Sequence, residues 1–144
     1  MIYDDELYLD TEFNGFGGEL ISMALVSGRR NGEWYEAVEF CGDVDPWVAT
    51  HVIPVLDRTP LERGIFIDSL HQFLRRFQSP MIVCDWHADA EHFCRMLAGK
   101  DYGTSLDFDC TIRILNASGG GFKSRVPHNA LEDARALLTY VRGR

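Results

Sequence analysis

Two carboxylates stand two residues apart in the first apolar segment of the chain, at Asp10 and Glu12. Side chains of a β-strand alternate between its two faces, so both carboxylates are expected on one face and Leu7, Leu9 and Phe13 on the other. Two carboxylates held together in a low-dielectric site must share a proton or bind cations, and ligands made only of oxygen suit Mg²⁺ or Mn²⁺. The alternative is an edge strand whose acidic face is solvated.

A histidine and a second group of acids surround the expected start of the last helix. His128 comes immediately before this helix, and Asp133 lies at the margin of its apolar stripe. An imidazole is suited to general-base chemistry at neutral pH. The alternatives are an exposed loop histidine and ordinary helix-start chemistry, in which Asn129 and Glu132 form a capping-box-like pair and the helix dipole favours acids.

A third acidic group lies between an expected buried strand and the helix that follows it. Asp85 and Asp89 bracket Trp86, His87 and Ala88 at this junction. Ligands often bind at the carboxyl ends of strands in α/β folds. The alternative is that Asp89 is the N-cap of the helix and that Asp85 and His87 are surface residues.

Hydrophobic periodicity predicts the elements that must position these residues. Short glycine-bearing links favour an antiparallel meander of three β-rich runs, residues 6–13, 19–27 and 34–40. A buried strand is predicted for residues 81–84. Helices are predicted for residues 46–56, for the apolar stripe from Phe66 to Phe77, and for two segments that begin at about Asp89 and at about Asn129. The predicted fold is one α/β domain over residues 1–144, with a mixed central sheet of three antiparallel strands and then a parallel strand, flanked by helices.

The overall charge limits the choice of partner. The 144 residues include 14 Lys plus Arg and 22 Asp plus Glu, a formal net charge of −8, so the protein as a whole repels polyanions. A nucleic acid can still bind where cations neutralise the local carboxylates. The alternative is that the charge serves solubility alone.

The cysteines and the N-terminal residues indicate the cellular compartment of the protein. Four cysteines without metal-site spacing are interpreted as reduced thiols of the core: Cys41, Cys84, Cys94 and Cys110. The acidic N-terminus lacks the pattern of a signal peptide, and no apolar run is long enough to span a membrane. These features indicate a cytoplasmic protein.

In chain order, the three acidic groups resemble the motifs of the DnaQ-like, or DEDDh, 3′–5′ exonucleases of the ribonuclease H-like superfamily. That family carries Asp-x-Glu on its first strand, an Asp at a mid-chain strand-to-helix turn, and His-x4-Asp at its last helix. The resemblance spans about residues 7–141. The short chain without appendages is most similar to the stand-alone exoribonucleases of the ribonuclease T, oligoribonuclease and mycobacterial ribonuclease AS kinds.

This resemblance implies a two-metal site with His128 as the general base. It also implies four carboxylate ligands for two Mg²⁺ or Mn²⁺ ions: Asp10, Glu12, Asp89 and Asp133. The middle motif lacks the asparagine that the family often has and is one residue shorter, so Asp85 is kept as the alternative to Asp89. Asp109 resembles a structural acid of the family and is left out of the site.

The activity implied is the removal of 5′-mononucleotides from the 3′ end of single-stranded RNA by a homodimer. The alternatives are a DNA exonuclease of proofreading or phage type, and a non-catalytic nucleic-acid-binding or dimerisation module. Expected substrate contacts combine aromatic rings that stack on bases with nearby polar and cationic groups: Phe13, Asn14, Phe16, Trp86, Lys123 and Arg125.

Overall fold

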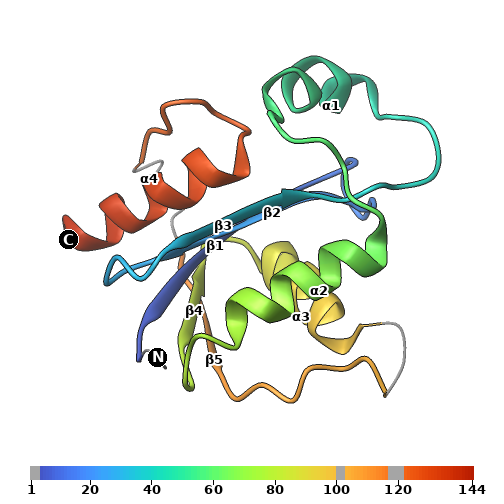
Figure 1. The fold of residues 1–144 in the computed structure, drawn as a ribbon. Helices are drawn as coiled ribbons and strands as arrows, with labels where there is room; N and C mark the ends of the chain where they lie inside the picture. The colour runs from blue at the N-terminus through green and yellow to red at the C-terminus, as the bar shows by residue number, and fades with distance from the viewer. Residues whose placement is uncertain (1–3, 100–102, 117–121) are drawn as a thin grey trace.

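A five-stranded sheet lies at the centre of the molecule (Figure 1). The structure is a computed structural model and describes residues 4–99, 103–116 and 122–144. The strands are β1 (Glu6–Phe13), β2 (Leu20–Ser27), β3 (Glu33–Ala37), β4 (Met81–Cys84) and β5 (Thr111–Ile114), in the spatial order β3-β2-β1-β4-β5. Neighbouring strands among β1, β2 and β3 are antiparallel, whereas β4 runs parallel to β1 and β5 parallel to β4. The predicted α/β class and the mixed sheet, antiparallel first and parallel afterwards, are confirmed.

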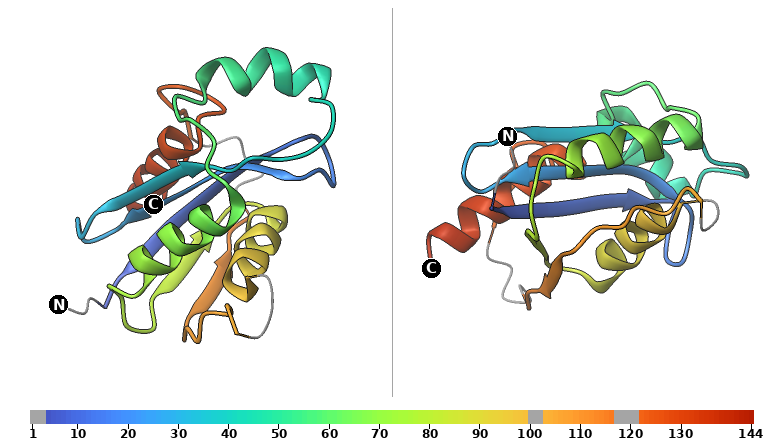
Figure 2. Two further views of the ribbon diagram at one scale, coloured as in Figure 1. Left: turned by 45° about the vertical axis from the view of Figure 1, so that its right-hand side comes forward. Right: turned by 60° about the horizontal axis from the view of Figure 1, so that its bottom comes forward.

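Helices cover both faces of the sheet. They are α1 (Pro46–His51), the 3₁₀ helix η1 (Ile53–Val55), α2 (Arg63–Leu74), α3 (His87–Ala98) and α4 (Ala130–Arg142). Helices α2 and α3 lie on one face, and α4 and α1 lie on the other (Figures 1 and 2). None of the helices in the described ranges combines the length and the apolar character that a membrane span requires.

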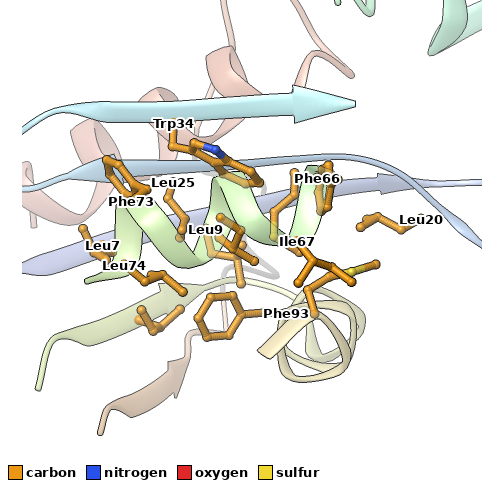
Figure 3. Close-up of a cluster of buried hydrophobic side chains, with 14 of the residues drawn as sticks. Leu7, Leu9, Leu20, Leu25, Trp34, Phe66, Ile67, Phe73, Leu74 and Phe93 are labelled. Atoms are coloured by element: carbon orange, nitrogen blue, oxygen red, sulfur yellow. The ribbon is translucent and has the colours of Figure 1, made fainter. Parts of the chain in front are cut away.

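The alternation of side chains along β1 divides the core into two layers. Leu7 and Leu9 point toward α2 and α3, where they join the buried rings of Phe66 and Phe93 (Figure 3). Tyr8 points to the opposite face and is buried beneath α4. Helix α4 packs on this face through a stripe of small and apolar residues, Ala130, Ala134 and Leu137. Asp10 and Glu12 follow Tyr8 on this same face, toward the first turn of α4, which carries Asp133.

The helix predicted for residues 46–56 is divided in two. Asp45 begins α1 by accepting hydrogen bonds from the N–H groups of Trp47 and Val48, and the regular helix ends at His51. Pro54 has no N–H group to continue the helical bonding, and the chain tightens there into η1. The prediction of one continuous helix was wrong for this reason.

Two further expectations require correction. Strand β5 was not predicted, because it is a short edge strand whose alternating side chains are largely exposed, and it therefore carries little periodic signal. The interpretation of the four cysteines as core thiols holds for Cys84, which is buried, but is wrong for Cys41 and Cys94, which are exposed.

Candidate active site

Parallel pairing of β1 and β4 brings the first and the middle acidic groups together. Tyr8 of β1 pairs with Val83 of β4, and β4 ends one residue later at Cys84. If this register is continued, Asp10 lies opposite Asp85, at the carboxyl edge where the two strands end their pairing. Asp89 follows Asp85 by four residues, and the chain turns into α3 between them. The polar residues after β4 therefore face the acidic end of β1.

Asp10, Asp85 and Asp89 form one cluster of carboxylates. One ligand atom from each lies within 4.8 Å of the others. Asp89 is buried and sits in the first turn of α3, whose N-cap is Trp86, so the alternative that Asp89 is the N-cap of this helix is wrong. Its Oδ1 accepts hydrogen bonds from the backbone N–H of Thr11 at 3.2 Å and from the Thr11 hydroxyl at 2.5 Å. These bonds fix the orientation of Asp89 toward Asp10.

Glu12, His128 and Asp133 form the second cluster. One ligand atom from each again lies within 4.8 Å of the others. His128 has a φ of 71°, in the left-handed region that side chains other than glycine adopt only rarely. Its backbone N–H donates to Asp133 Oδ2 at 3.1 Å. Residues from the first strand and from the start of the last helix thus meet at one site.

Burial raises the pKa of these carboxyl groups. Burial raises the pKa of Asp10 well above its ordinary value, and the nearby charges of Asp89 and Glu12 raise it further. Burial, followed by the charge of Asp133 and a hydrogen bond to it, raises the pKa of Glu12 to about 9. Burial raises the pKa of Asp89 to about 7, although the hydrogen bonds from Thr11 oppose the change. A site that is this acidic and this poorly solvated needs protons or cations to balance its charge.

The donor set fits hard divalent cations. The ligand atoms of the Asp10, Asp85 and Asp89 cluster are all carboxylate oxygens, and Glu12 and Asp133 add more beside His128. Asp10 Oδ2 is enclosed by protein and has no hydrogen-bond partner among the described residues. A buried carboxylate oxygen without a donor is costly unless a cation or a proton takes that place. Oxygen-rich ligand sets of this kind suit Mg²⁺ or Mn²⁺.

A pocket of about 690 Å³, which we call the acidic pocket, opens beside these acids. Its lining combines carboxylates with aromatic rings and comes from β1, the β1–β2 turn, α1, the β4–α3 junction and His128: Asp10, Thr11, Glu12, Phe13, Gly15, Phe16, Asp45, Trp47, Val48, Asp85, Trp86, Asp89 and His128. Phe16 is 96% exposed and Trp86 is 48% exposed, so both rings are available to a ligand. The pocket therefore offers metal-type ligands at its base and flat apolar surfaces at its rim.

Three of the expected substrate contacts line the acidic pocket, and three do not. Phe13, Phe16 and Trp86 belong to its lining. The side chain of Asn14 is bonded elsewhere, donating to the Asp43 carbonyl and accepting from the Asp45 N–H. Lys123 and Arg125 are exposed and line a separate pocket of about 500 Å³ beside α4. The glycine-rich run at residues 118–121 lies outside the described residues.

Two further predictions concern acids outside the carboxylate clusters, Asp109 and Glu132. Asp109 is exposed and accepts a hydrogen bond from the Ser79 hydroxyl at 2.9 Å. It belongs to neither of the two carboxylate clusters. The capping-box-like pair is half formed, because Asn129 Oδ1 accepts from the Glu132 N–H at 3.0 Å, whereas the Glu132 carboxylate pairs with Arg135 at 2.6 Å.

Sequence reasoning missed five residues of the pocket lining: Thr11, Gly15, Asp45, Trp47 and Val48. Two of them contact predicted site residues. Thr11, which supports Asp89, was hidden by its position on the apolar side of β1. Trp47 lines the pocket and makes an edge contact with the His128 ring, with centroids 4.9 Å apart. The Asp45-Pro46 helix start was the available signal for Trp47, since it puts a tryptophan in the first turn of a short helix.

Comparison with known proteins adds no assignment. The sequence matches no protein-family model and no curated protein. Function is therefore inferred from the chemistry and the geometry of the residues.

Proposed function

We propose that this protein is a two-metal 3′–5′ exoribonuclease of the DnaQ-like kind, built on a ribonuclease H-like fold. The observation that carries the proposal is that residues from the start, the middle and the end of the chain meet in two clusters whose charges act on one another: Asp10, Glu12, Asp89, His128 and Asp133. These are the residues, in the same chain order, on which the family resemblance rests. A cytoplasmic homodimer is part of the same proposal and rests on the resemblance and on the sequence pattern.

The proposed reaction is hydrolysis of the terminal phosphodiester bond. The carboxylates of Asp10, Glu12, Asp89 and Asp133 would hold two divalent cations, whose chemistry when bound is to activate a water and to stabilise the departing oxygen. His128 accepts the proton that the attacking water loses. As the water oxygen bonds to phosphorus, the bond to the 3′ oxygen of the preceding nucleotide breaks. The departing 3′ oxygen takes a proton from solvent water, and His128 returns its proton to solvent. The products are a 5′-mononucleotide and a strand one nucleotide shorter with a free 3′-hydroxyl.

The surroundings of His128 support this role. Asp133 accepts its backbone N–H, and the Trp47 ring lies against its imidazole. The bond to Asp133 holds the backbone of His128, and the Trp47 contact restricts its ring on the side of the pocket that also holds Glu12. A general base must stay within reach of the proton that it removes, and restriction of this kind favours that geometry.

The rim of the acidic pocket supports a nucleobase as the ligand. Phe16 stands at the tip of the β1–β2 turn, where Gly15 and Gly17 adopt positive φ values of 78° and 74° and project the ring into solvent. Trp86 lies at the β4–α3 junction, stacked on His87 with centroids 4.7 Å apart. Exposed aromatic rings bind unpaired bases by stacking and do so with little sequence preference. A single-stranded end is therefore the favoured substrate.

The test is a cleavage assay on single-stranded RNA and DNA labelled at either end, with Mg²⁺, Mn²⁺ or chelator. A 5′-labelled RNA should shorten one nucleotide at a time, and a 3′-labelled RNA should release its label as a mononucleotide at once. Asp10→Asn should abolish both signals, whereas Asp109→Asn, which changes an exposed acid outside the site, should leave them unchanged.

Other results of this cleavage assay would favour different functions. Faster degradation of DNA would favour a DNA exonuclease. Binding of either strand without hydrolysis, under every metal condition, would favour the non-catalytic module. Internal cleavage products would contradict an exonuclease of either kind.

A further inference from the structure

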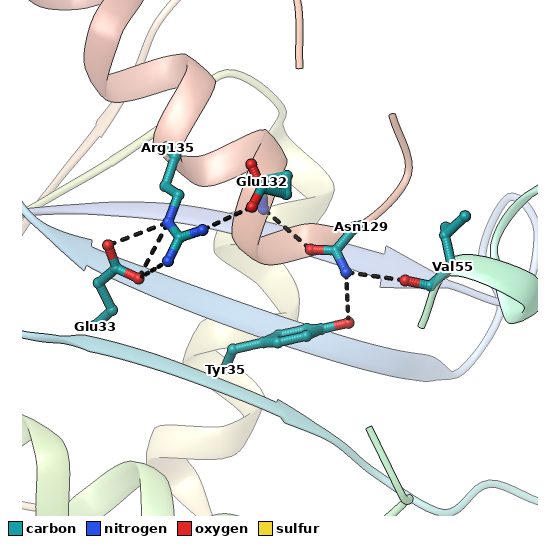
Figure 4. Close-up of polar contacts among 6 residues, drawn as sticks. All are labelled: Glu33, Tyr35, Val55, Asn129, Glu132 and Arg135. Carbon is teal, nitrogen blue, oxygen red and sulfur yellow. Dashed lines mark hydrogen bonds and ion pairs between the residues drawn. The ribbon is translucent and has the colours of Figure 1, made fainter. Parts of the chain in front are cut away.

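The side chain that begins α4 is joined to the segment that carries Trp47. Asn129 is the N-cap of α4 and is buried, and its Oδ1 accepts the Glu132 N–H. Its Nδ2 donates to the Val55 carbonyl at 2.9 Å and to the Tyr35 hydroxyl at 3.5 Å (Figure 4). The two N–H donors of this amide therefore bond to η1 and to β3, outside α4.

Tyr35 continues this connection. Its buried hydroxyl donates to the carbonyl of Leu56, the residue after Val55. Burial raises the pKa of Tyr35 to about 12, so the hydroxyl stays a donor at neutral pH. The Arg58 guanidinium lies 5.0 Å from the ring centroid, and its Nε donates to the Tyr35 carbonyl at 3.3 Å. Two successive carbonyls at the end of η1, which have no helical partners, therefore find donors on α4 and β3.

Helix capping alone does not explain an asparagine at this position. Asn, Asp and Ser are about equally good N-caps, because each offers one oxygen to the N–H groups of the first turn. Only the carboxamide adds two hydrogen-bond donors to that acceptor. Since both donors contact the η1 end of the α1–η1 segment (residues 45–56) or the tyrosine bonded to it, the amide serves the connection between the two elements.

The segment that is held in this way forms one wall of the acidic pocket. Asp45, Trp47 and Val48 line the pocket, and the Trp47 ring contacts both His51, at a centroid distance of 4.5 Å, and His128 at 4.9 Å. Its other end is bonded to the β1–β2 turn through Asn14. Because Asn129 follows His128 directly, one side chain fixes both partners of the Trp47–His128 contact.

We infer that Asn129 is a positioning residue: its amide holds the α1–η1 segment against the start of α4, and thereby keeps the Trp47 ring against His128. The inference rests on the role proposed for His128. It assigns to Asn129 an effect on turnover that passes through His128, without contact with substrate or metal.

Two variants separate the amide donors from the helix cap. Asn129→Ser and Asn129→Asp keep an oxygen for the Glu132 N–H and lose the donor to Val55. Tyr35→Phe removes the donor to Leu56 and the 3.5 Å acceptor of Asn129 Nδ2, but leaves the Asn129 oxygen that caps α4 in place. The matched control is Asn31→Ser, which removes an amide bond of similar length, 2.7 Å to Asp5 Oδ2, at the far β2–β3 turn.

Hydrogen exchange of the substrate-free protein measures the connection directly. In both Asn129 variants and in Tyr35→Phe, exchange of residues 46–56 should become roughly tenfold faster, the scale expected for an unsatisfied buried carbonyl, with α2 and α3 unchanged. Asn31→Ser should leave residues 46–56 unchanged. Equal exchange in wild type and variants, or a uniform increase over all helices, would overturn the inference. This readout needs no activity, so it stands apart from the proposed function.

Turnover then tests whether the effect passes through His128. Asn129→Ser should lower turnover of single-stranded RNA roughly tenfold at an unchanged affinity for Mn²⁺. In a His128→Ala background the same substitution should cost almost nothing further, because both changes disable one group. A full tenfold loss in that background would overturn the assignment. If the wild-type protein hydrolyses no nucleic acid, the proposed function fails, while the exchange result still decides the connection.

Discussion

Thr11 donates two hydrogen bonds to a single oxygen of Asp89, one from its backbone N–H and one from its hydroxyl. The pair joins β1 to α3 at the level of the carboxylate clusters. Without these bonds the pKa of Asp89 would rise further, since burial raises it and the bonds from Thr11 lower it. Thr11 therefore favours the charged form of the carboxylate, which is the form that binds a cation.

Removal of the Thr11 hydroxyl should weaken the site without destroying it. Thr11→Val keeps the backbone bond and the shape of the side chain, but removes one donor to Asp89. Residues that support metal ligands typically contribute about 10–100-fold to affinity or activity, so a loss on that scale is expected in Mn²⁺ titration and in turnover. Thr11→Ser, which restores a hydroxyl, should recover most of it. Wild-type values for Thr11→Val would show that the backbone bond is sufficient.

The two candidates for the middle ligand should differ in their effect. Asp89 is buried and bonded by Thr11, whereas Asp85 is half-buried at the end of β4. Asp89→Asn should lower turnover by about 100-fold or more, while Asp85→Asn should keep most of the activity. Single-turnover kinetics on 5′-labelled RNA measure both variants. The opposite order would assign the middle ligand to Asp85 and leave the rest of the site as proposed.

Metal removal provides the most direct test of the chemistry. Hydrolysis should cease in EDTA and return on addition of Mg²⁺ or Mn²⁺, because without cations the carboxylates repel the phosphate and nothing stabilises the departing oxygen. Isothermal titration should detect two Mn²⁺ ions per chain, and Asp10→Asn should remove at least one. Full activity in chelator is the result that this proposal does not survive.

The sequence predicted the elements with strong periodicity and missed those without it. Strand β1 and strand β4 were predicted with their observed bounds, because alternating or continuous apolar residues define them. Pro54 divides the segment that was predicted as one helix. Strand β5 was not predicted, because its largely exposed side chains give the sequence pattern of a loop. Local pattern was sufficient for β1 and β4, which carry regular runs of buried side chains.

The same distinction applies to the site. Strand alternation was enough to predict that Asp10 and Glu12 share a face. The participation of Thr11 and Trp47 depends on how β1, α3, α1 and α4 pack together, and no spacing along the chain encodes that packing. The choice between Asp89 and Asp85 depends likewise on the pairing of β1 with β4, which brings both carboxylates to Asp10.

The stability of the metal-free protein should fall as pH rises. Free Asp and Glu side chains titrate near pH 4, whereas folding raises the pKa of Asp89 to about 7 and that of Glu12 to about 9. The folded state therefore binds more protons than the unfolded state between these values, and the stability present below pH 4 is lost progressively up to about pH 9. Thermal melts in EDTA from pH 4 to 9 measure this, and Mn²⁺ should reverse the trend at high pH.

Neutralising one of these acids should stabilise the metal-free protein. Asp10→Asn removes a carboxyl group whose charged form is disfavoured by burial and by the charges of Asp89 and Glu12. At pH 8 in EDTA its melting temperature should exceed that of wild type by about 3–5 °C, the shift that roughly 1 kcal/mol produces in a domain of this size. With Mn²⁺ the order should reverse. An Asp10→Asn protein that is less stable in EDTA would show that this carboxylate has a structural partner in the absence of metal.

His128 should affect turnover but not metal binding. If its imidazole takes the proton of the attacking water, His128→Ala should lower turnover by about 10²–10⁴-fold, the usual contribution of general-base catalysis. Its backbone N–H still donates to Asp133 in that variant, so the carboxylates keep their arrangement and should bind Mn²⁺ with unchanged affinity. Calorimetry and single-turnover assays on the same preparation separate the alternatives. A surface histidine would change neither quantity and a metal ligand would change both, so wild-type turnover with two bound Mn²⁺ ions would remove His128 from the mechanism.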